Sequence, residues 1–281
     1  MTTGNVEQSE FWERRAPDWI AGTSYTDVIT GAFGADAMDR LELAPGQRVF
    51  DVGCGTGATT VELARRVGSG GEAIGVDISP TLVAASRTAA ADAGLGNVSF
   101  RVADAQVESL GDRDLDAVYS RFGVMFFADP VVAFTNIRRA LRPDGVLAFV
   151  CWQPVATNEW VSVPGMAAMR VTGSPPPTPV AGAPGPFSLA DADHVRSTLI
   201  SAGFQNVEVA SPVRTVSFPA SQLDLLASSS QQVGGVRDIL KTADAETTAR
   251  IESAIRDALA LHVKGDAVTL GAAAHVVRAT A

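Results

Sequence analysis

The nine residues VFDVGCGTG, at positions 49–57, join an apolar run to three glycines at alternate positions. The apolar run is typical of a buried strand, and a helical pattern follows at 58–67. Glycines between a strand and a helix permit a tight turn and let a ligand approach the backbone. Asp51 precedes the first glycine by two residues, where a carboxylate would repel a pyrophosphate and attract an ammonium group. The loop therefore favours a positively charged nucleoside without phosphate.

The spacing of the glycines also separates this loop from two common alternatives. A dinucleotide-binding loop has the pattern G-x-G-x-x-G, whereas residues 53–57 have G-x-G-x-G. A phosphate-binding P-loop would continue with Lys-Ser or Lys-Thr, and this segment does not. An NAD(P)-dependent oxidoreductase is accordingly disfavoured.

Strand and helix patterns alternate on both sides of the loop. Apolar runs rich in Val, Phe and Ile, typical of strands, lie at 47–52, 72–78, 97–103, 115–120 and 145–151. Helical patterns at 58–67, 80–93 and 130–141 lie between them. Such alternation predicts an α/β fold, with a mostly parallel sheet covered by helices on both faces. The ligand is then expected at the carboxyl ends of the strands.

Two further acids follow predicted strands. Asp77 ends the second strand, 20 residues beyond Gly57, and a carboxylate there can accept both ribose hydroxyls of an adenosine. It could instead cap the next helix, although Ser79 suits that role better. Asp104 ends the third strand and could accept a hydrogen bond from an adenine amino group. Three acids at successive strand ends point to one nucleoside site.

These residues resemble the class I S-adenosylmethionine-dependent methyltransferases, in the small-molecule branch near the ubiquinone/menaquinone methyltransferases. The similarity rests on the loop with its acid, on Asp77, on Asp104-Ala105-Gln106 and on RALRPDGVL at 139–147. It is specific over residues 46–152. It implies a Rossmann-like, mostly parallel seven-stranded sheet whose last strand is antiparallel. Asp144 departs from the family, in which glycine is commoner, but it falls in a turn.

The resemblance implies S-adenosylmethionine as cofactor and assigns roles to individual residues. The methionine end would be held by Asp51 and by the loop backbone of Gly53, Cys54, Gly55, Thr56 and Gly57. The ribose would be held by Asp77, with Ile78 packed on the adenine. The adenine edge would meet Asp104, Ala105 and Gln106. Ser120 and Arg121 would border the methionine, and Trp19 would close over the cofactor.

Four regions are expected along the chain. Residues 1–45 would form an N-terminal helical cap and 46–152 the cofactor-binding core. Residues 153–205 would form a lid or insert, within which the proline- and glycine-rich stretch 173–186 is predicted to be mobile. Residues 206–281 would supply the last strands, 206–218 and 267–279, with a helical acceptor cap inserted at 219–265.

Composition limits the partners. The net charge of −9 disfavours binding to nucleic acid or to an anionic membrane. Two cysteines exclude a disulfide framework. The polar N-terminal segment does not resemble a signal peptide, and no apolar run is long enough to insert into a membrane, so a cytoplasmic location is expected. The oligomeric state stays open.

Catalytic residues are harder to identify. Of three histidines, His194 is the candidate general base on the acceptor side, although histidines in helices are more often structural. No cluster has metal-ligand spacing, so no metal is expected. The sequence predicts a methyltransferase that acts on a small, fairly apolar metabolite by in-line transfer. The alternative is a fold relative that binds S-adenosylmethionine but catalyses another reaction, such as a cyclisation.

Overall fold

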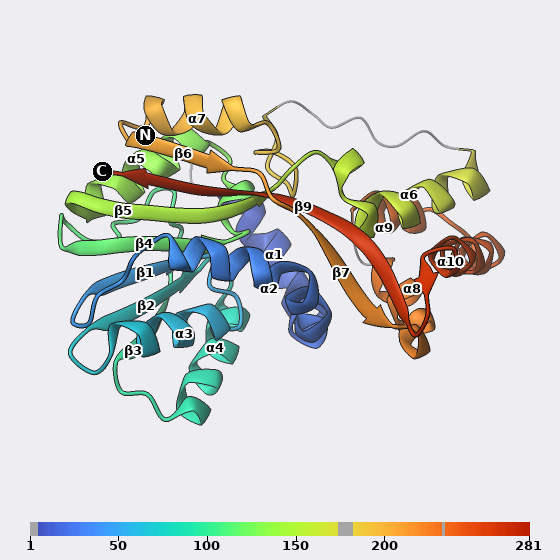
Figure 1. The fold of residues 1–281 in the computed structure, drawn as a ribbon, viewed down its shortest axis with the longest axis horizontal. Coiled ribbons are helices and arrows are strands. Elements are labelled where there is room, and N and C mark those ends of the chain that lie inside the picture. Colours follow the sequence, from blue (N-terminus) through green and yellow to red (C-terminus); the bar gives the residue numbers. More distant parts are fainter. Residues whose placement is uncertain (1–4, 174–181, 232–233) are drawn as a thin grey trace.

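A sheet of nine strands runs through the molecule (Figure 1). The structure is a computed structural model that describes residues 5–173, 182–231 and 234–281. The strands are β1 (Arg48–Val52), β2 (Glu72–Asp77), β3 (Val98–Val102), β4 (Leu115–Arg121), β5 (Leu141–Trp152), β6 (Gln205–Ala210), β7 (Val213–Pro219), β8 (Val263–Lys264) and β9 (Ala267–Thr280).

The main part of the sheet has the order β3-β2-β1-β4-β5-β9-β6. The first five strands in this order pair in parallel. Strand β9 runs antiparallel to both β5 and β6, so β6 has the same direction as the first five. The predicted mostly parallel seven-stranded sheet with a reversed last strand is confirmed, and β7 and β8 extend it by pairing with β9.

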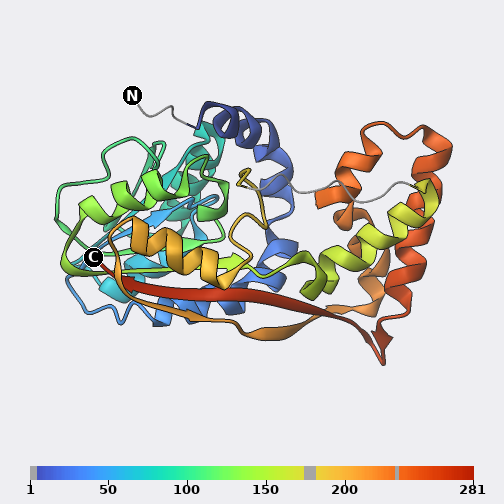
Figure 2. The same ribbon diagram turned by 90° about the horizontal axis from the view of Figure 1, so that it is seen from above.

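Helices cover both faces of the sheet (Figures 1 and 2). Helices α3 and α4 pack on β1 to β3, α2 packs on β4, β5 and β9, and α5 and α7 cover β5 and β6. The helices are α1 (Val6–Ala21), α2 (Thr23–Asp39), α3 (Ala58–Val67), α4 (Pro80–Ala93), α5 (Pro130–Ala140), α6 (Glu159–Thr172), α7 (Ala192–Ser201), α8 (Leu223–Ser230), α9 (Gly234–Leu240) and α10 (Ala245–Ala260), with 3₁₀ turns η1 (Val124–Phe126), η2 (Val155–Thr157) and η3 (Ala220–Gln222).

Local sequence sets where the crossover helices begin. The Ser79 hydroxyl accepts the backbone N–H of Leu82 at 3.2 Å, and Pro80 occupies the first helical position of α4. Asp129 and Pro130 repeat this arrangement at α5. A polar cap satisfies a free N–H, and proline has no N–H to lose, so both starts are stable.

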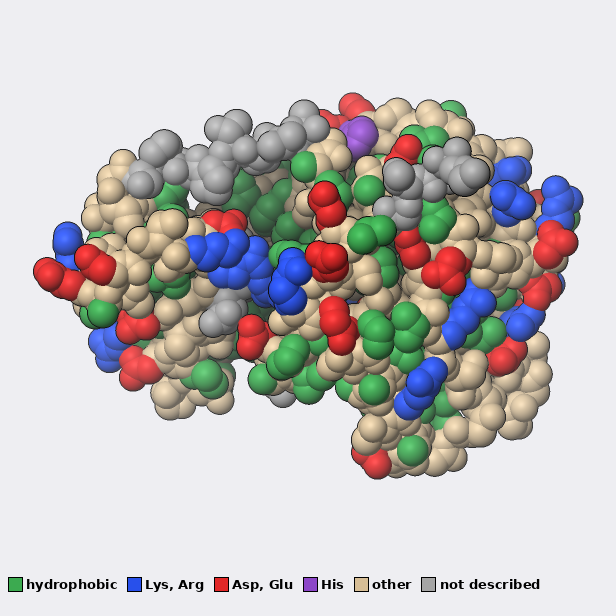
Figure 3. All heavy atoms as spheres, turned by 180° about the vertical axis from the view of Figure 1, so that it is seen from behind, with side chains coloured by type: hydrophobic (Ala, Val, Ile, Leu, Met, Phe, Trp, Pro, Cys, Tyr) green, Lys and Arg blue, Asp and Glu red, His purple; other side chains and the backbone are tan. Residues whose placement is uncertain are grey.

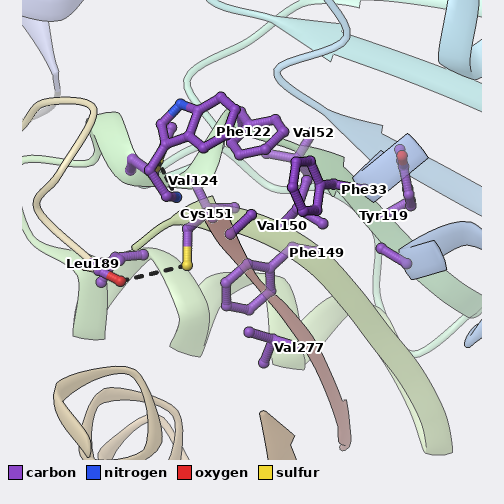
Figure 4. Packing of buried hydrophobic residues seen from close by; sticks show 14 of the residues in the cluster. Phe33, Val52, Tyr119, Phe122, Val124, Phe149, Val150, Cys151, Leu189 and Val277 are labelled. Atoms are coloured by element: carbon purple, nitrogen blue, oxygen red, sulfur yellow. Dashed lines mark hydrogen bonds between the residues drawn. The ribbon is translucent and has the colours of Figure 1, made fainter. Parts of the chain in front are cut away.

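The core lies between the middle strands and the helices on both faces (Figure 4). Phe149 of β5 stacks on Phe134 of α5, with ring centroids 5.3 Å apart. On the other face Phe33 of α2 meets Trp152 edge to face at 6.0 Å. Both faces of β5 are thus buried, as its continuous apolar run predicts.

The expected strand 206–218 is two strands in the structure. The chain leaves β6 at Ala210 and enters β7 at Val213. Pro212 lies between them and has no N–H for a strand ladder, so pairing breaks there. Strand β9 pairs with β5 and β6 along its second half and with β7 along its first half. The β7–β9 ribbon therefore leaves the main sheet and leads to the cap.

Helices α6, α8, α9 and α10 gather at the far end of this ribbon (Figure 2). We call these four helices the cap. The segment expected as one insert, 153–205, has two parts: α6 belongs to the cap, whereas α7 covers β6. Most of the stretch predicted as a mobile lid, 173–186, lies outside the described residues. None of the described helices is long and apolar enough to span a membrane.

Candidate functional site

A cavity of about 530 Å³ opens at the carboxyl ends of β1 to β4. Val52, Asp77, Ala103 and Arg121 line it from these four strand ends. Helices α1 and α2 and parts of the cap supply the remaining walls. This is the edge at which parallel α/β sheets bind their ligands, because the loops after the strands converge there.

The glycine loop forms the floor of the cavity. Gly53 has φ of 70°, and a Cβ there would lie 2.9 Å from the Cα of Gly123, so no larger residue fits. The N–H groups of Gly53 and Cys54 donate to the carbonyl of Val76 and fix the loop to β2. At Gly55 a Cβ would lie 3.3 Å from Nε1 of Trp19, which places that indole directly over the loop.

Not every loop residue faces the cavity. Gly53 and Gly55 line it, whereas Cys54, Thr56 and Gly57 do not. Cys54 is buried in a small apolar cluster that includes Phe100. Burial raises the pKa of its thiol well above the ordinary value, so the thiol stays protonated and serves packing.

Asp77 is buried and faces the cavity. Its carboxylate accepts the N–H of Gly55 at 2.9 Å and the N–H of Ser79 at 3.0 Å. Burial nevertheless dominates and raises the pKa of Asp77 to about 6. The side chain is therefore a carboxylate at neutral pH, with lone pairs left over for a ligand.

Asp104 also lines the cavity, but it already has partners. Its two oxygens accept the backbone N–H of Asn5 at 2.8 Å and the side-chain amide of Asn5 at 3.0 Å. The carbonyl of the Asn5 side chain accepts the N–H of Ala128. Helix α1 is thus pinned over the ends of β3 and β4. Ala105 lines the cavity, whereas Gln106 is buried outside it and accepts the N–H of Asp129.

Asp51 and Ser120 lie behind the cavity wall. One carboxylate oxygen of Asp51 accepts the hydroxyls of Thr59 and Thr60 at 2.6 and 2.7 Å. Its other oxygen is buried and has no partner among the described residues. Burial raises the pKa of Asp51. Ser120 donates to the carbonyl of Val52, which supports the loop rather than a ligand.

Arg121 and the aromatic residues form the opposite wall. The Arg121 guanidinium lines the cavity and pairs with Asp27 of α2 at 2.8 Å. Phe122 and Trp152 stack with centroids 4.0 Å apart, and Trp160 meets Trp152 at 4.9 Å. Ile78 completes the wall near Asp77. This wall is therefore largely aromatic.

The candidate base, His194, lies elsewhere. It is exposed on α7 and does not line the cavity. His275 is buried between Ser211 and the carbonyl of Ala190. In the described part of the chain, no group of three or more His, Cys, Asp and Glu side chains is placed to hold a metal.

The sequence predicted helical caps at 1–45 and 219–265 and named Trp19, which lines the cavity, but it did not identify the other lining residues of α1, α2 and α9. Asn5, Phe11, Arg15, Tyr25 and Arg237 all line the cavity. The aromatics Phe11, Trp12 and Trp19 at helical spacing were the available signal for α1. Burial raises the pKa of Tyr25 to about 12, so it faces the cavity as a neutral phenol.

Comparison with known proteins agrees with this geometry. Residues 50–149 match the family model described as a methyltransferase domain. The chain is 34% identical over 128 residues to nocamycin O-methyltransferase of Saccharothrix syringae, covering 45% of this chain and 46% of that protein. It is 36% identical over 104 residues to the ubiquinone/menaquinone biosynthesis C-methyltransferase UbiE of Teredinibacter turnerae, covering 37% and 42%. The chain spans about half the length of the curated relatives it matches.

Solved structures share the fold at low sequence identity. The YcgJ protein of Bacillus subtilis superposes with a TM-score of 0.58 at 17% identity, covering 89% of this chain and 97% of that one. The [4+2]-cyclase SpnF superposes with a TM-score of 0.52 at 20% identity, covering 89% and 79%. Both likenesses concern the fold alone.

Proposed function

We propose that the protein transfers a methyl group from S-adenosylmethionine to a small, fairly apolar metabolite, in keeping with the match of residues 50–149 to the methyltransferase domain model. The transfer is direct and in line. The observation that carries the proposal is the buried Asp77 carboxylate, which faces the cavity beside a glycine loop in which a Cβ at Gly53 would meet the backbone.

The residues present fit this cofactor. Asp77 is a carboxylate at neutral pH and can accept ribose hydroxyls, with Ile78 beside it. Asp51 lies behind the loop and does not line the cavity, so its negative charge favours a cationic ligand end at a distance rather than by contact. Gly53 and Gly55 leave room for a ligand against the backbone, under Trp19. An adenosine with an amino-acid tail matches these groups, whereas a pyrophosphate would face two carboxylates.

The adenine end requires one adjustment. Asp104 and Ala105 line the cavity there, but Asn5 holds both oxygens of Asp104. An adenine amino group would either share the Asp104 carboxylate with Asn5 or displace Asn5 from it. We assign a group of residues that do not reach the cavity to the support of the site: Asp51, Cys54, Thr56, Gly57, Gln106 and Ser120.

The remaining walls determine the chemistry. The cofactor supplies a methyl group on a positively charged sulfur. Phe122, Trp152 and Trp160 line the cavity and would exclude water around the acceptor. A dry site favours a reaction in which charge is lost, since water would stabilise the charged reactants. The aromatic wall therefore supports an apolar acceptor.

The test is methyl transfer itself. Purified protein is incubated with S-adenosylmethionine carrying a trideuterated methyl group and a metabolite extract. Mass spectrometry should find a product that gains the labelled methyl, together with S-adenosylhomocysteine. The variant Asp77→Ala serves as control and should lose both. Binding of the cofactor without release of S-adenosylhomocysteine, across extracts from several growth conditions, would contradict methyl transfer and favour a reaction such as a cyclisation.

A further inference from the structure

The cavity is wider than its cofactor end and has a second, charged region. Away from the glycine loop it extends between α1 and the cap, where Phe11, Trp12 and Phe126 line it. Trp12 meets Phe126 edge to face at 4.8 Å. In the view from behind, Lys and Arg side chains lie beside a hollow with hydrophobic side chains in it (Figure 3). A positive group beside an aromatic surface indicates that this part of the cavity can recognise a polar group of a ligand as well as its apolar body.

Arg237 of α9 lies in this charged region and has a buried donor. It lines the cavity, its side chain is 27% exposed, and its Nε is buried with no hydrogen-bond partner among the described residues. The guanidinium carbon lies 5.4 Å from the centroid of the Phe11 ring. A buried donor without an acceptor is costly, so a ligand that supplies the acceptor would be favoured.

The charges around Arg237 leave it incompletely neutralised. Its carboxylate neighbour Asp238 lies 3.5 Å away and is shared with Lys241, whose ammonium is closer at 2.8 Å. The guanidinium of Arg15 lies over the same Phe11 ring at 5.5 Å. Asp18 is an acid of α1 that also lines the cavity. Two guanidinium groups thus lie close to one aromatic ring at this end of the cavity.

We propose that Arg237 binds an anionic group of the acceptor, so that the acceptor is an aromatic acid rather than a neutral apolar molecule. This inference rests on the proposed function, because it concerns the acceptor of the same site. The planar guanidinium suits a carboxylate or sulfonate, which it can meet with two parallel hydrogen bonds. The aromatic wall would hold the body of the molecule.

The test compares two fluorescent probes that differ in one group. 8-Anilinonaphthalene-1-sulfonate carries an anion, and N-phenyl-1-naphthylamine has the same rings without it. Dissociation constants are measured by fluorescence for the wild type, Arg237→Met, Arg237→Lys and Lys241→Met. Lys241 is the matched control, because it also contacts Asp238 but does not line the cavity.

We expect Arg237→Met to weaken binding of the sulfonate about tenfold or more, with little change for the neutral probe. Arg237→Lys should recover part of the loss. Lys241→Met frees Asp238 to neutralise Arg237 further, so it should weaken the sulfonate by less than Arg237→Met does and leave the neutral probe unchanged. Equal losses for the two probes, or an equal effect of Lys241→Met, would overturn the proposal.

Calorimetry with S-adenosylmethionine separates this proposal from the one on which it rests. Arg237→Met should keep the cofactor affinity of the wild type, and a marked loss would show that Arg237 serves the cofactor instead. Failure of the wild type to bind S-adenosylmethionine would contradict the proposed function, while the comparison of the two probes would still decide the role of Arg237.

Discussion

Replacing Asp77 by Asn tests whether the buried carboxylate lowers the free energy of unfolding of the protein. The Asp77 side chain is buried and accepts two backbone N–H groups, from Gly55 and Ser79. These bonds favour the carboxylate, yet burial outweighs them and raises the pKa of Asp77 from 3.8 to about 6. Asn has the same shape without the charge.

The magnitude follows from the difference between the two pKa values. The folded protein binds the Asp77 proton more tightly than the unfolded chain does, whose pKa is near 3.8. Stability is therefore lost as the pH rises from about 4 to above about 6. At 1.36 kcal/mol for each unit of pKa, the cost reaches about 3 kcal/mol at high pH. Asp77→Asn removes this pH-dependent loss of unfolding free energy. Its altered hydrogen bonding also changes the unfolding free energy, but by an amount that does not depend on pH.

Urea unfolding of both proteins from about pH 4 to about pH 8 isolates the effect, because all other titrating groups are common to the two. The difference in unfolding free energy should move by about 2.5 kcal/mol in favour of Asp77→Asn across this range, because part of the effect is already present at about pH 4. Parallel pH profiles would refute the reasoning.

Cofactor affinity should change in the opposite direction. Loss of two charge-assisted hydrogen bonds to ribose would weaken S-adenosylmethionine binding to Asp77→Asn about a hundredfold at pH 8. In the wild type, affinity should fall about tenfold for each pH unit below about 6, as Asp77 becomes protonated. Calorimetry measures both, and equal dissociation constants for wild type and variant would contradict the ribose assignment.

Three other substitutions have defined outcomes. Asp144→Gly should raise the free energy of unfolding by up to about 1 kcal/mol in urea, because Asp144 has φ of 64° and glycine adopts that conformation without strain; an unchanged midpoint would contradict this. Gly57→Ala should lower the free energy of unfolding by about 2 kcal/mol or more, and by more than Gly68→Ala does. Both glycines have positive φ, but only at Gly57 would a new Cβ crowd a neighbour, the Cβ of Ser86 at 2.7 Å. Equal effects of the two substitutions would argue against crowding. Glu13→Ala should speed proteolytic cleavage within α1. Glu13 accepts hydrogen bonds from two hydroxyl groups at the start of α4, and these bonds hold α1 in place and lower the pKa of Glu13. Cleavage at the wild-type rate would show that apolar contacts hold α1.

The sequence predicted the parallel sheet because its strands are buried on both faces and appear as separate apolar runs. It also predicted that Asp77 and Asp104 lie at one edge, since parallel strands end together. It could not show that Asn5 binds Asp104, because 99 residues separate them and only tertiary packing brings them together. Arg237 was equally hidden, since nothing local distinguishes an arginine in a short helix from a solvated one.

The place of β9 in the sheet has a consequence for synthesis on the ribosome. β9 lies between β5 and β6, yet it is translated after both. Until residues 267–280 emerge, the nascent chain exposes the unpaired edge of β5, and β6 has no neighbour in the sheet. Exposed edges and long-range pairing make such a chain slow to complete and prone to associate with other chains. Chaperone demand during translation should therefore persist until β9 has left the exit tunnel, long after β1 to β4 have been made.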